Sequence, residues 1–442
     1  MVSAENVAEW KRLRKIGIIG MGAMGQLYAE RFSAAGWQVL CCDRSERYAE
    51  LVAKYADSAL TILQNGYLVS RECDYIIYSV EAANIGAIVA QYGPSTKLGA
   101  IVGGQTSCKS GELQAFEQHL PADVDIVTVH SLHGPKVDPE GQPLVLIDHR
   151  TSRPDSFPFV EALMSCLRSR HVYITGEEHD QITADTQAIT HAAFLSMGLA
   201  WYKRQVYPWD AGAGKWCGGL ENAKMNISLR IYSNKWHVYA GLAITNPTAH
   251  CHVTVYAQSA TDLFTLMIEH RKDTLRDRLL AAKAAVFRHR RGNLLLDDAM
   301  LDRFSLSKAP LPPGSTPPPN SHLSLLAIVD SWHRLGIDPY DHMLCSTPLF
   351  RIFLGVSEYL FLAPGLLERT IVHAVDDSTF RADDLEFVAA ARSWSQLISF
   401  GNFDLYRRQF EEVQRFFEPM FPDATRIGNA MIRTILAHDP GA

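Results

Sequence analysis

Hydrophobic and polar positions alternate along the first third of the chain in blocks that suit strands separated by helices. Short apolar runs at residues 15–19, 39–42, 74–80, 100–103 and 125–129 have the length and β-branched content of buried strands. More polar, helix-like segments separate these runs. The βαβ alternation predicts a doubly wound parallel sheet of the α/β class, with its ligand-binding edge at the carboxyl ends of the strands.

From about Glu178 onward the strand pattern fades and the periodicity of long amphipathic helices dominates. Six prolines interrupt this periodicity between residues 309 and 320, which is typical of a linker. The pattern therefore predicts an N-terminal Rossmann domain followed by an all-α region, divided as 1–178, 179–308, the linker 309–320, and a second helical domain at 321–442.

The two predicted helical domains share a sequence pattern. The apolar positions of residues 191–201 match those of residues 322–332, and both segments begin with His and end with Trp. The helical patterns of residues 259–282 and 393–412 are also loosely similar. We interpret these matches as a duplication of one helical domain; a chance likeness between amphipathic helices is the alternative.

The first apolar run ends in a glycine motif that is typical of dinucleotide binding. In Gly-x-Gly-x-x-Gly the first glycine allows a tight turn, the second lets the backbone approach a pyrophosphate, and the third lets the helix pack on the strand. The next strand ends at Asp43, 18 residues after the last glycine, where an acid usually binds the ribose 2′-OH of NAD. The basic residues just after it would instead bind the 2′-phosphate of NADP if Asp43 turns away. The predicted cofactor site comprises Gly20, Met21, Gly22, Ala23, Met24, Gly25, Asp43, Arg44, Ser45 and, after the strand at 74–80, Val80.

Composition narrows the class of protein. The chain has 442 residues, a net charge of −6 and a charged fraction of 20%, which is ordinary for a globular enzyme and argues against nucleic acid or an anionic membrane as main partner. Its eight cysteines show no C-x-x-C spacing, and no apolar run has the length of a membrane span. We expect a cytoplasmic protein with reduced thiols.

Four clusters carry candidate chemistry. Ser107 and Lys109 follow the predicted strand at 100–103, and His130 follows the strand at 125–129, so all three are expected at the ligand-binding edge. His191 and Arg230 lie in helical segments, and an arginine in an apolar helix needs an anionic partner. His-x-x-His at 130–133 has no third ligand at a convincing spacing, so no metal site is predicted.

Together these clusters resemble those of prephenate dehydrogenases, and most closely the NADP-dependent fungal type. The resemblance covers essentially the full length, including residues 129–136, 180–191 and 330–361. It implies oxidative decarboxylation of prephenate to 4-hydroxyphenylpyruvate, in tyrosine biosynthesis, with hydride transfer to NADP. By the same resemblance, His130 is the catalytic histidine and Ser107 hydrogen-bonds to it. His191, Lys109 and Arg230 are implied to bind substrate, with Arg230 on a carboxylate.

Two departures from the bacterial pattern are visible. Ser131 stands where bacterial relatives have proline, which leaves the loop geometry open, and Gly104 stands where they have aspartate. In bacterial relatives the helical domain dimerises, so this chain is expected to be a homodimer or, through the duplication, a monomeric pseudo-dimer. The alternatives are an arogenate dehydrogenase, which uses the same catalytic residues, and a non-catalytic NADP-binding sensor.

Overall fold

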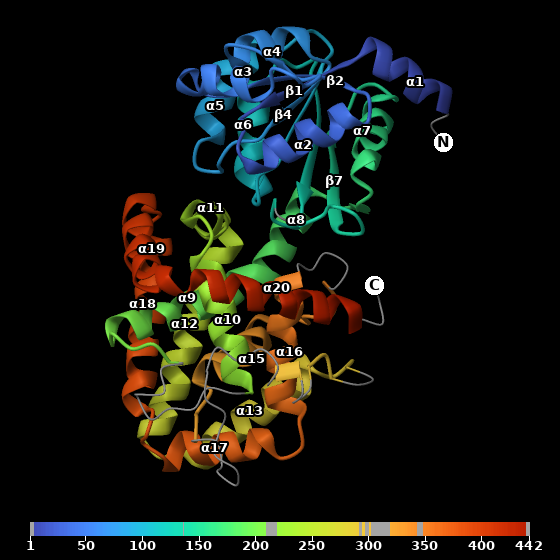
Figure 1. The fold of residues 1–442 in the computed structure, drawn as a ribbon. Helices are drawn as coiled ribbons and strands as arrows, with labels where there is room; N and C mark the ends of the chain where they lie inside the picture. The colour runs from blue at the N-terminus through green and yellow to red at the C-terminus, as the bar shows by residue number, and fades with distance from the viewer. Residues whose placement is uncertain are drawn as a thin grey trace. The chain divides into compact units, whose positions relative to one another are not determined.

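The computed structural model describes residues 4–135, 137–208, 219–290, 294–296, 300–301, 319–342 and 348–438. The chain forms two compact units, Met1–Ile182 and Thr183–Ala442 (Figure 1). The predicted linker at 309–320 falls outside the described residues except for its last two positions.

The first unit is built on an eight-stranded sheet with the order β3-β2-β1-β4-β5-β6-β7-β8. All neighbouring strands run parallel except β6 and β7, which pair antiparallel. The chain crosses over at β1, so the strand order reverses between β1 and β4, which is where a doubly wound sheet binds its ligand. The strands are β1 Lys15–Ile19, β2 Gln38–Cys42, β3 Thr61–Ile62, β4 Tyr75–Tyr78, β5 Ile101–Gly104, β6 Asp125–Ser131, β7 Pro143–Arg150 and β8 Arg170–Tyr173.

Helices cover both faces of this sheet, and each face has its own hydrophobic core. Residues of α2 and α7 pack on one face around Phe32 and Phe159, while residues of α4, α5 and α6 pack on the other around Val89 and Phe116 (Figure 1). The helices of the unit are α1 Ala4–Leu13, α2 Ala23–Ala34, α3 Tyr48–Lys54, α4 Gly66–Glu72, α5 Ile85–Tyr92, α6 Lys109–His119, α7 Ser156–Met164 and α8 Gly176–Thr183. The doubly wound prediction is confirmed.

The structure differs from the sequence prediction in the second half of the sheet. The sixth strand continues through His130 to Ser131, so His130 lies within a strand and not in the loop after it. It continues because β7 pairs antiparallel with it, and His130 lies opposite Val145. The apolar run at 144–147 was the available signal for this strand, but a purely parallel prediction has no place for it.

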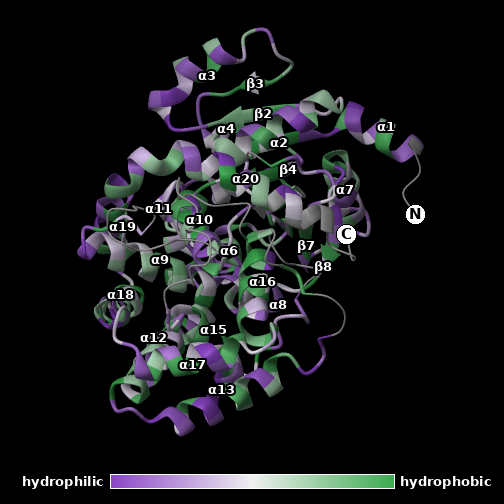
Figure 2. Ribbon diagram, turned by 60° about the horizontal axis from the view of Figure 1, so that its bottom comes forward, coloured by the Kyte–Doolittle hydropathy of each residue, from purple (hydrophilic) through white to green (hydrophobic). Residues whose placement is uncertain are grey.

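The second unit is helical. A π-helical turn at Ala184–Ala188 leads into a series of helices that share one large hydrophobic core. Along α13 the buried residues recur every three or four positions, and hydrophobic and hydrophilic residues alternate accordingly (Figure 2). The helices are α9 Ile189–Lys203, α10 Leu220–Tyr232, α11 Trp236–Thr245, α12 Pro247–Ile268, α13 Lys272–Val286, α15 Leu323–Leu335, α16 Pro348–Leu362, α17 Leu366–Asp376, α18 Arg381–Ser399, α19 Phe403–Phe417 and α20 Phe421–His438.

The described helices of this unit repeat in order and length. Helices α9 to α13 have 15, 13, 10, 22 and 15 residues, and α15 to α19 have 13, 15, 11, 19 and 15. The packing is reciprocal, because α9 contacts α18 of the second series and α15 contacts α12 of the first. The two series therefore interleave in one compact unit, where the sequence pattern predicted two helical domains joined by a linker.

Among the described residues no single helix is long and apolar enough to cross a membrane, although Leu349–Leu362 and Leu366–Asp376, bent by 83°, reach that length and composition as a pair.

Candidate active site

The glycine turn between β1 and α2 has the backbone geometry of a phosphate-binding loop. Gly20 adopts a φ of 104°, and a Cβ there would lie 2.3 Å from the carbonyl oxygen of Ser79. A Cβ on Gly25 would lie 2.0 Å from the carbonyl oxygen of Gly20, so the start of α2 packs directly on the turn. By contrast nothing in the described part of the chain lies within 4 Å of a Cβ on Gly22, which is the N-cap of α2. This open space at a helix N-terminus suits an anion such as a pyrophosphate.

The acid at the end of β2 is turned toward the protein. The Asp43 carboxylate accepts hydrogen bonds from the backbone N–H of Met21 at 2.9 Å and from Arg47 Nη1 at 2.6 Å. Its other oxygen accepts from the backbone N–H of Arg44 at 2.7 Å, whereas the Arg44 side chain is 79% exposed. The condition that the sequence left open, that Asp43 turns away and leaves a cation exposed, is therefore met. The remaining predicted residue of the cofactor site, Val80, lies just beyond β4 and is half-buried.

His130 on β6 is held by a second histidine. Its Nδ1 lies 2.7 Å from Nε2 of His179 on α8, and the two rings are 5.0 Å apart edge to face. His179 is buried, and its Nδ1 lies 2.9 Å from Oδ1 of Asp180. Burial lowers the pKa of His130 well below its usual value, and the nearby His179 and Lys109 lower it further. The imidazole is therefore neutral near pH 7, as a general base must be.

Asp180 also closes the N-terminus of α6, the helix that follows the loop carrying Ser107. Its carboxylate accepts from the backbone N–H of Lys109 at 2.6 Å and of Ser110 at 2.8 Å. Burial alone would raise its pKa, but the hydrogen bonds from His179 and from these backbone groups hold the pKa at about 2. Asp180 is consequently an anion at neutral pH.

Ser107 does not make the contact that the resemblance implies. Its residue is half-buried in the loop between β5 and α6, and within the described part of the chain no hydrogen bond joins it to His130. The ring nitrogen of His130 that has a protein partner is paired with His179. A role for Ser107 in the reaction therefore stays a prediction.

Lys109 is placed differently from the prediction. Its side chain is fully buried, and its ammonium lies 2.8 Å from Glu112 Oε1, 2.8 Å from the carbonyl oxygen of Val129 and 3.1 Å from Thr128 Oγ1. These contacts turn the ammonium into the protein beneath the strand ends, because Lys109 is the first residue of α6 and Glu112 lies one turn further along. This geometry argues against direct substrate binding and indicates that Lys109 supports the loop and β6 from within.

Glu112 fills the space left by Gly104. A Cβ on Gly104 would lie 2.2 Å from Glu112 Oε2, so a larger residue there would collide with this carboxylate. The same carboxylate accepts from the backbone N–H of Thr106 at 3.0 Å and from its hydroxyl at 2.7 Å. An acid is thus present beside β5 although residue 104 itself is glycine.

Ser131, the other departure from the bacterial pattern, has a defined partner. Its hydroxyl lies 2.6 Å from the hydroxyl of Tyr28 on α2, and both side chains are buried. This contact joins the strand of His130 to the helix of the glycine turn. The loop geometry is thereby settled by a hydrogen bond that proline could not form.

In the helical unit, His191 and Arg230 both lie beside Tyr239. The His191 ring packs edge to face on Tyr239 at 4.9 Å, and burial lowers the pKa of His191 to about 3. Its Nδ1 is buried and has no hydrogen-bond partner among the residues that the structure describes. Burial also lowers the pKa of Arg230, while the ring of Tyr239 opposes this shift. His191 is thus a neutral polar group and not a cation.

The Arg230 guanidinium has no carboxylate partner among the described residues. Its Nη1 donates to Asn429 Oδ1 at 2.7 Å, across the contact between α10 and α20. A buried guanidinium normally pairs with an anion, because desolvating an isolated charge is costly. An anionic ligand would complete this site.

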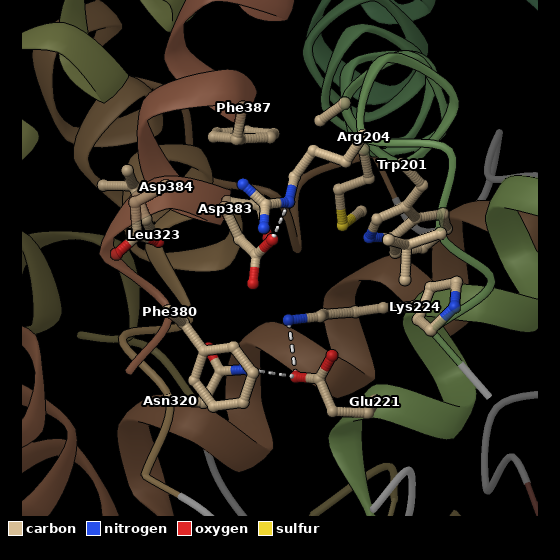
Figure 3. Close-up of a pocket in the computed structure, with 15 residues that line it drawn as sticks. Trp201, Arg204, Glu221, Lys224, Asn320, Leu323, Phe380, Asp383, Asp384 and Phe387 are labelled. Atoms are coloured by element: carbon tan, nitrogen blue, oxygen red, sulfur yellow. Dashed lines mark hydrogen bonds and ion pairs between the residues drawn. The ribbon is translucent and has the colours of Figure 1, made fainter. Parts of the chain in front are cut away.

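The largest pocket found in the described part of the helical unit lies elsewhere and is internally neutralised (Figure 3). It measures about 830 Å³ and is lined by aromatic and charged side chains from α9, α10, α15 and α18. Arg204 pairs with Asp383 at 2.6 Å, and Lys224 pairs with Glu221 at 2.6 Å. The predicted site residues lie outside this pocket, and these charged pairs compensate one another within it.

Comparison with known proteins adds to this geometry. Residues 188–437 match a family described as a 6-phosphogluconate dehydrogenase C-terminal domain, and residues 15–118 match the NAD binding domain of 6-phosphogluconate dehydrogenase. The chain is 64% identical over 440 residues to a Saccharomyces cerevisiae protein named prephenate dehydrogenase [NADP(+)], covering 99% of this chain and 97% of that protein. The chain belongs to the prephenate dehydrogenase family.

Two further relatives of this prephenate dehydrogenase family member are informative. A Schizosaccharomyces pombe protein named probable prephenate dehydrogenase [NADP(+)] is 54% identical over 431 residues, covering 96% of this chain and 98% of that protein. The crystal structure of prephenate dehydrogenase from A. aeolicus, with hydroxyphenyl propionate and NAD+, has 16% identity and a TM-score of 0.48, covering 60% of this chain and 94% of that one.

Sequence reasoning did not assign roles to His179, Asp180 or Tyr239. The adjacent pair His179-Asp180 was visible in the sequence, but its meaning depends on a contact with His130 across 49 positions. Tyr239 carried no signal of its own, since tyrosines in apolar helices are usually core residues.

Proposed function

We propose that this chain oxidises and decarboxylates prephenate to 4-hydroxyphenylpyruvate, with reduction of NADP, as a step of tyrosine biosynthesis. The observation that carries the proposal is the match to prephenate dehydrogenases over 99% of the chain, at 64% identity. The neutral, hydrogen-bonded imidazole of His130 in the dinucleotide-binding unit supplies the group that this reaction requires.

The described residues fit NADP. The open backbone at Gly22 and the N-terminus of α2 would hold the pyrophosphate. Asp43 is occupied by Arg47 and the backbone of Met21, so its charge is compensated and does not face a 2′-phosphate alone. The exposed guanidinium of Arg44 is available for that phosphate. Bound NADP supplies the acceptor for the hydride from C4 of the substrate.

His130 would take the proton of the substrate hydroxyl on Nε2. The O–H bond breaks, its electron pair forms the ketone-like centre at C4 as the hydride leaves, and loss of CO₂ then makes the ring aromatic. The proton transfer needs a neutral imidazole within reach of the hydroxyl, and the lowered pKa of His130 keeps the ring neutral at pH 7. No metal is needed to carry these electrons.

Arg230 would bind a carboxylate of prephenate. It is a half-buried guanidinium with only an amide partner among the described residues, and a carboxylate can accept two parallel hydrogen bonds from it. The neutral His191 would contribute a hydrogen bond and not a charge.

Absorbance at 340 nm tests the function directly. Purified protein is mixed with prephenate and either NADP or NAD, with arogenate in parallel cuvettes. Rapid reduction of NADP with prephenate is expected. Turnover of arogenate alone would identify an arogenate dehydrogenase, and tight NADP binding without turnover of either compound would favour a sensor.

The interleaved helices support a second part of the proposal, that the helical unit is a fused pseudo-dimer. Buried positions of α12 recur in α18 at a spacing of 135 residues, for example Ala249 with Asp384 and Val253 with Val388. Each series packs on the other in the reciprocal way expected of two copies of one domain. Light scattering of the purified protein should give the mass of one 49.3 kDa chain; a tight dimer would contradict this.

A further inference from the structure

We infer that His179 and Asp180 form a positioning relay that fixes the tautomer of His130. The inference rests on the proposed function, since it explains how the proposed base is kept ready. Neither residue was given a role by the sequence, and both lie with His130 in the same compact unit.

The direction of each hydrogen bond follows from Asp180. Its carboxylate is surrounded by donors: the backbone N–H groups of Lys109 and Ser110, and the thiol of Cys108 at 3.3 Å. As an anion it can only accept, so His179 Nδ1 must carry the proton in their 2.9 Å contact.

A neutral His179 then has only a lone pair on Nε2. That lone pair lies 2.7 Å from His130 Nδ1, so His130 must donate through Nδ1–H. The Nε2 of His130 is thereby left unprotonated, which is the form able to take a proton. The sequence of contacts is carboxylate, imidazole, imidazole, and it matches in logic the carboxylate that orients the histidine of a hydrolase triad.

Burial gives the relay its selectivity. His179 is 1% exposed and Asp180 is 6% exposed, so water does not compete for these contacts. Asp180 is moreover tied to the N-terminus of α6, which fixes the position of the carboxylate relative to the sheet. When His130 gains a proton, its Nδ1–H keeps the same acceptor, and the buried anion lies two hydrogen bonds away.

The relay takes over the task that the resemblance gave to Ser107. A serine hydroxyl can donate or accept, so it would fix the ring orientation less strictly than a carboxylate chain does. The structure therefore separates orientation of the base, by His179 and Asp180, from any contact of Ser107 with substrate.

Two substitutions of His179 test the inference. His179→Leu removes the acceptor and should lower kcat roughly 10²–10⁴-fold, with the KM for prephenate and the NADP affinity within about twofold of wild type. His179→Gln places an amide oxygen near the former Nε2 and should restore a large part of kcat. His171→Leu is the matched control, because His171 is a half-buried histidine of the same unit that contacts Tyr173 and not His130.

Asp180→Asn is the second variant. The amide can donate to His179 Nδ1, which would leave Nε2–H facing His130 and force the inactive tautomer, so kcat should fall by a similar factor. Asp125→Asn serves as its control, because Asp125 is a buried carboxylate of β6 that binds Ser152 and Arg153. That control should lower the melting temperature and leave kcat unchanged.

A spectroscopic readout does not depend on turnover or on the variants folding. In protein labelled with ¹⁵N-histidine, with the His130 signals assigned through His130→Asn, the wild type should show His130 as the Nδ1–H tautomer. An Nε2–H tautomer in the wild type, or an unchanged kcat in folded His179→Leu, would overturn the relay. Failure of the wild type to oxidise prephenate would instead refute the proposed function, and the tautomer measurement would still decide the relay.

Discussion

Replacing Lys109 by methionine should destabilise the first unit without weakening substrate binding. The ammonium is fully buried with Glu112 at 2.8 Å, and it also serves the carbonyl oxygens of Val129 and Gly104. Methionine has a similar length but offers no donor. The variant therefore leaves a buried carboxylate without its cation and two carbonyl groups with one donor fewer.

The expected loss can be worked from these contacts. Removing one partner of a buried ion pair costs about 3–5 kcal/mol in the free energy of unfolding. For a unit of the size of Met1–Ile182, each kcal/mol lowers the melting temperature by about 2–4 °C, so a drop of roughly 6–20 °C is expected. Surface ion pairs are worth far less, about 0–1 kcal/mol.

Thermal melts followed by circular dichroism, together with the KM for prephenate, provide the assay. Lys97→Met is the matched control, because Lys97 pairs with Asp74 at 2.6 Å but its side chain is 41% exposed. The double variant Lys109→Met/Glu112→Gln removes both charges and should recover part of the loss. An unchanged melting temperature with a raised KM in Lys109→Met would refute this reasoning and restore Lys109 as a substrate-binding residue.

The remaining predictions concern the base, the substrate carboxylate and the cofactor. His130→Asn should cut kcat by about 10²–10⁴-fold while NADP still binds, as measured by fluorescence titration. Because burial lowers the pKa of His130 and the neutral ring is the active form, kcat/KM should stay constant as the pH falls from about 8 to the usual histidine range and decline only below it; a decline centred near about 6.5 would contradict this. Arg230→Ala should raise the KM for prephenate by the equivalent of about 2–4 kcal/mol, and an unchanged KM would remove Arg230 from the substrate site. Arg44→Ala should reduce the preference for NADP over NAD by about 10- to 100-fold in steady-state kinetics, whereas an unchanged preference would assign the 2′-phosphate to other residues.

Much of the first unit could be predicted from sequence because its signals are local. The turn at Gly20 depends on backbone sterics within a few residues, and the buried strands show as short apolar runs. The helical repeat was visible for the same reason, since burial at a helical period repeats in α9 and α15. These features need no knowledge of what each element packs against.

The arrangement of the catalytic groups was decided only by the tertiary structure. His130 and His179 are 49 positions apart, and their contact depends on β6 extending through pairing with β7 and on how α8 is rotated. Whether Lys109 faces a ligand or the interior likewise depends on the rotation of α6, which the sequence pattern does not fix. Periodicity determines which elements form and which face is buried, whereas side-chain partners across elements depend on register and rotation in three dimensions. The sequence alone thus determined the fold class, the dinucleotide turn and the family, and the folded chain decided which histidine, carboxylate and cation meet.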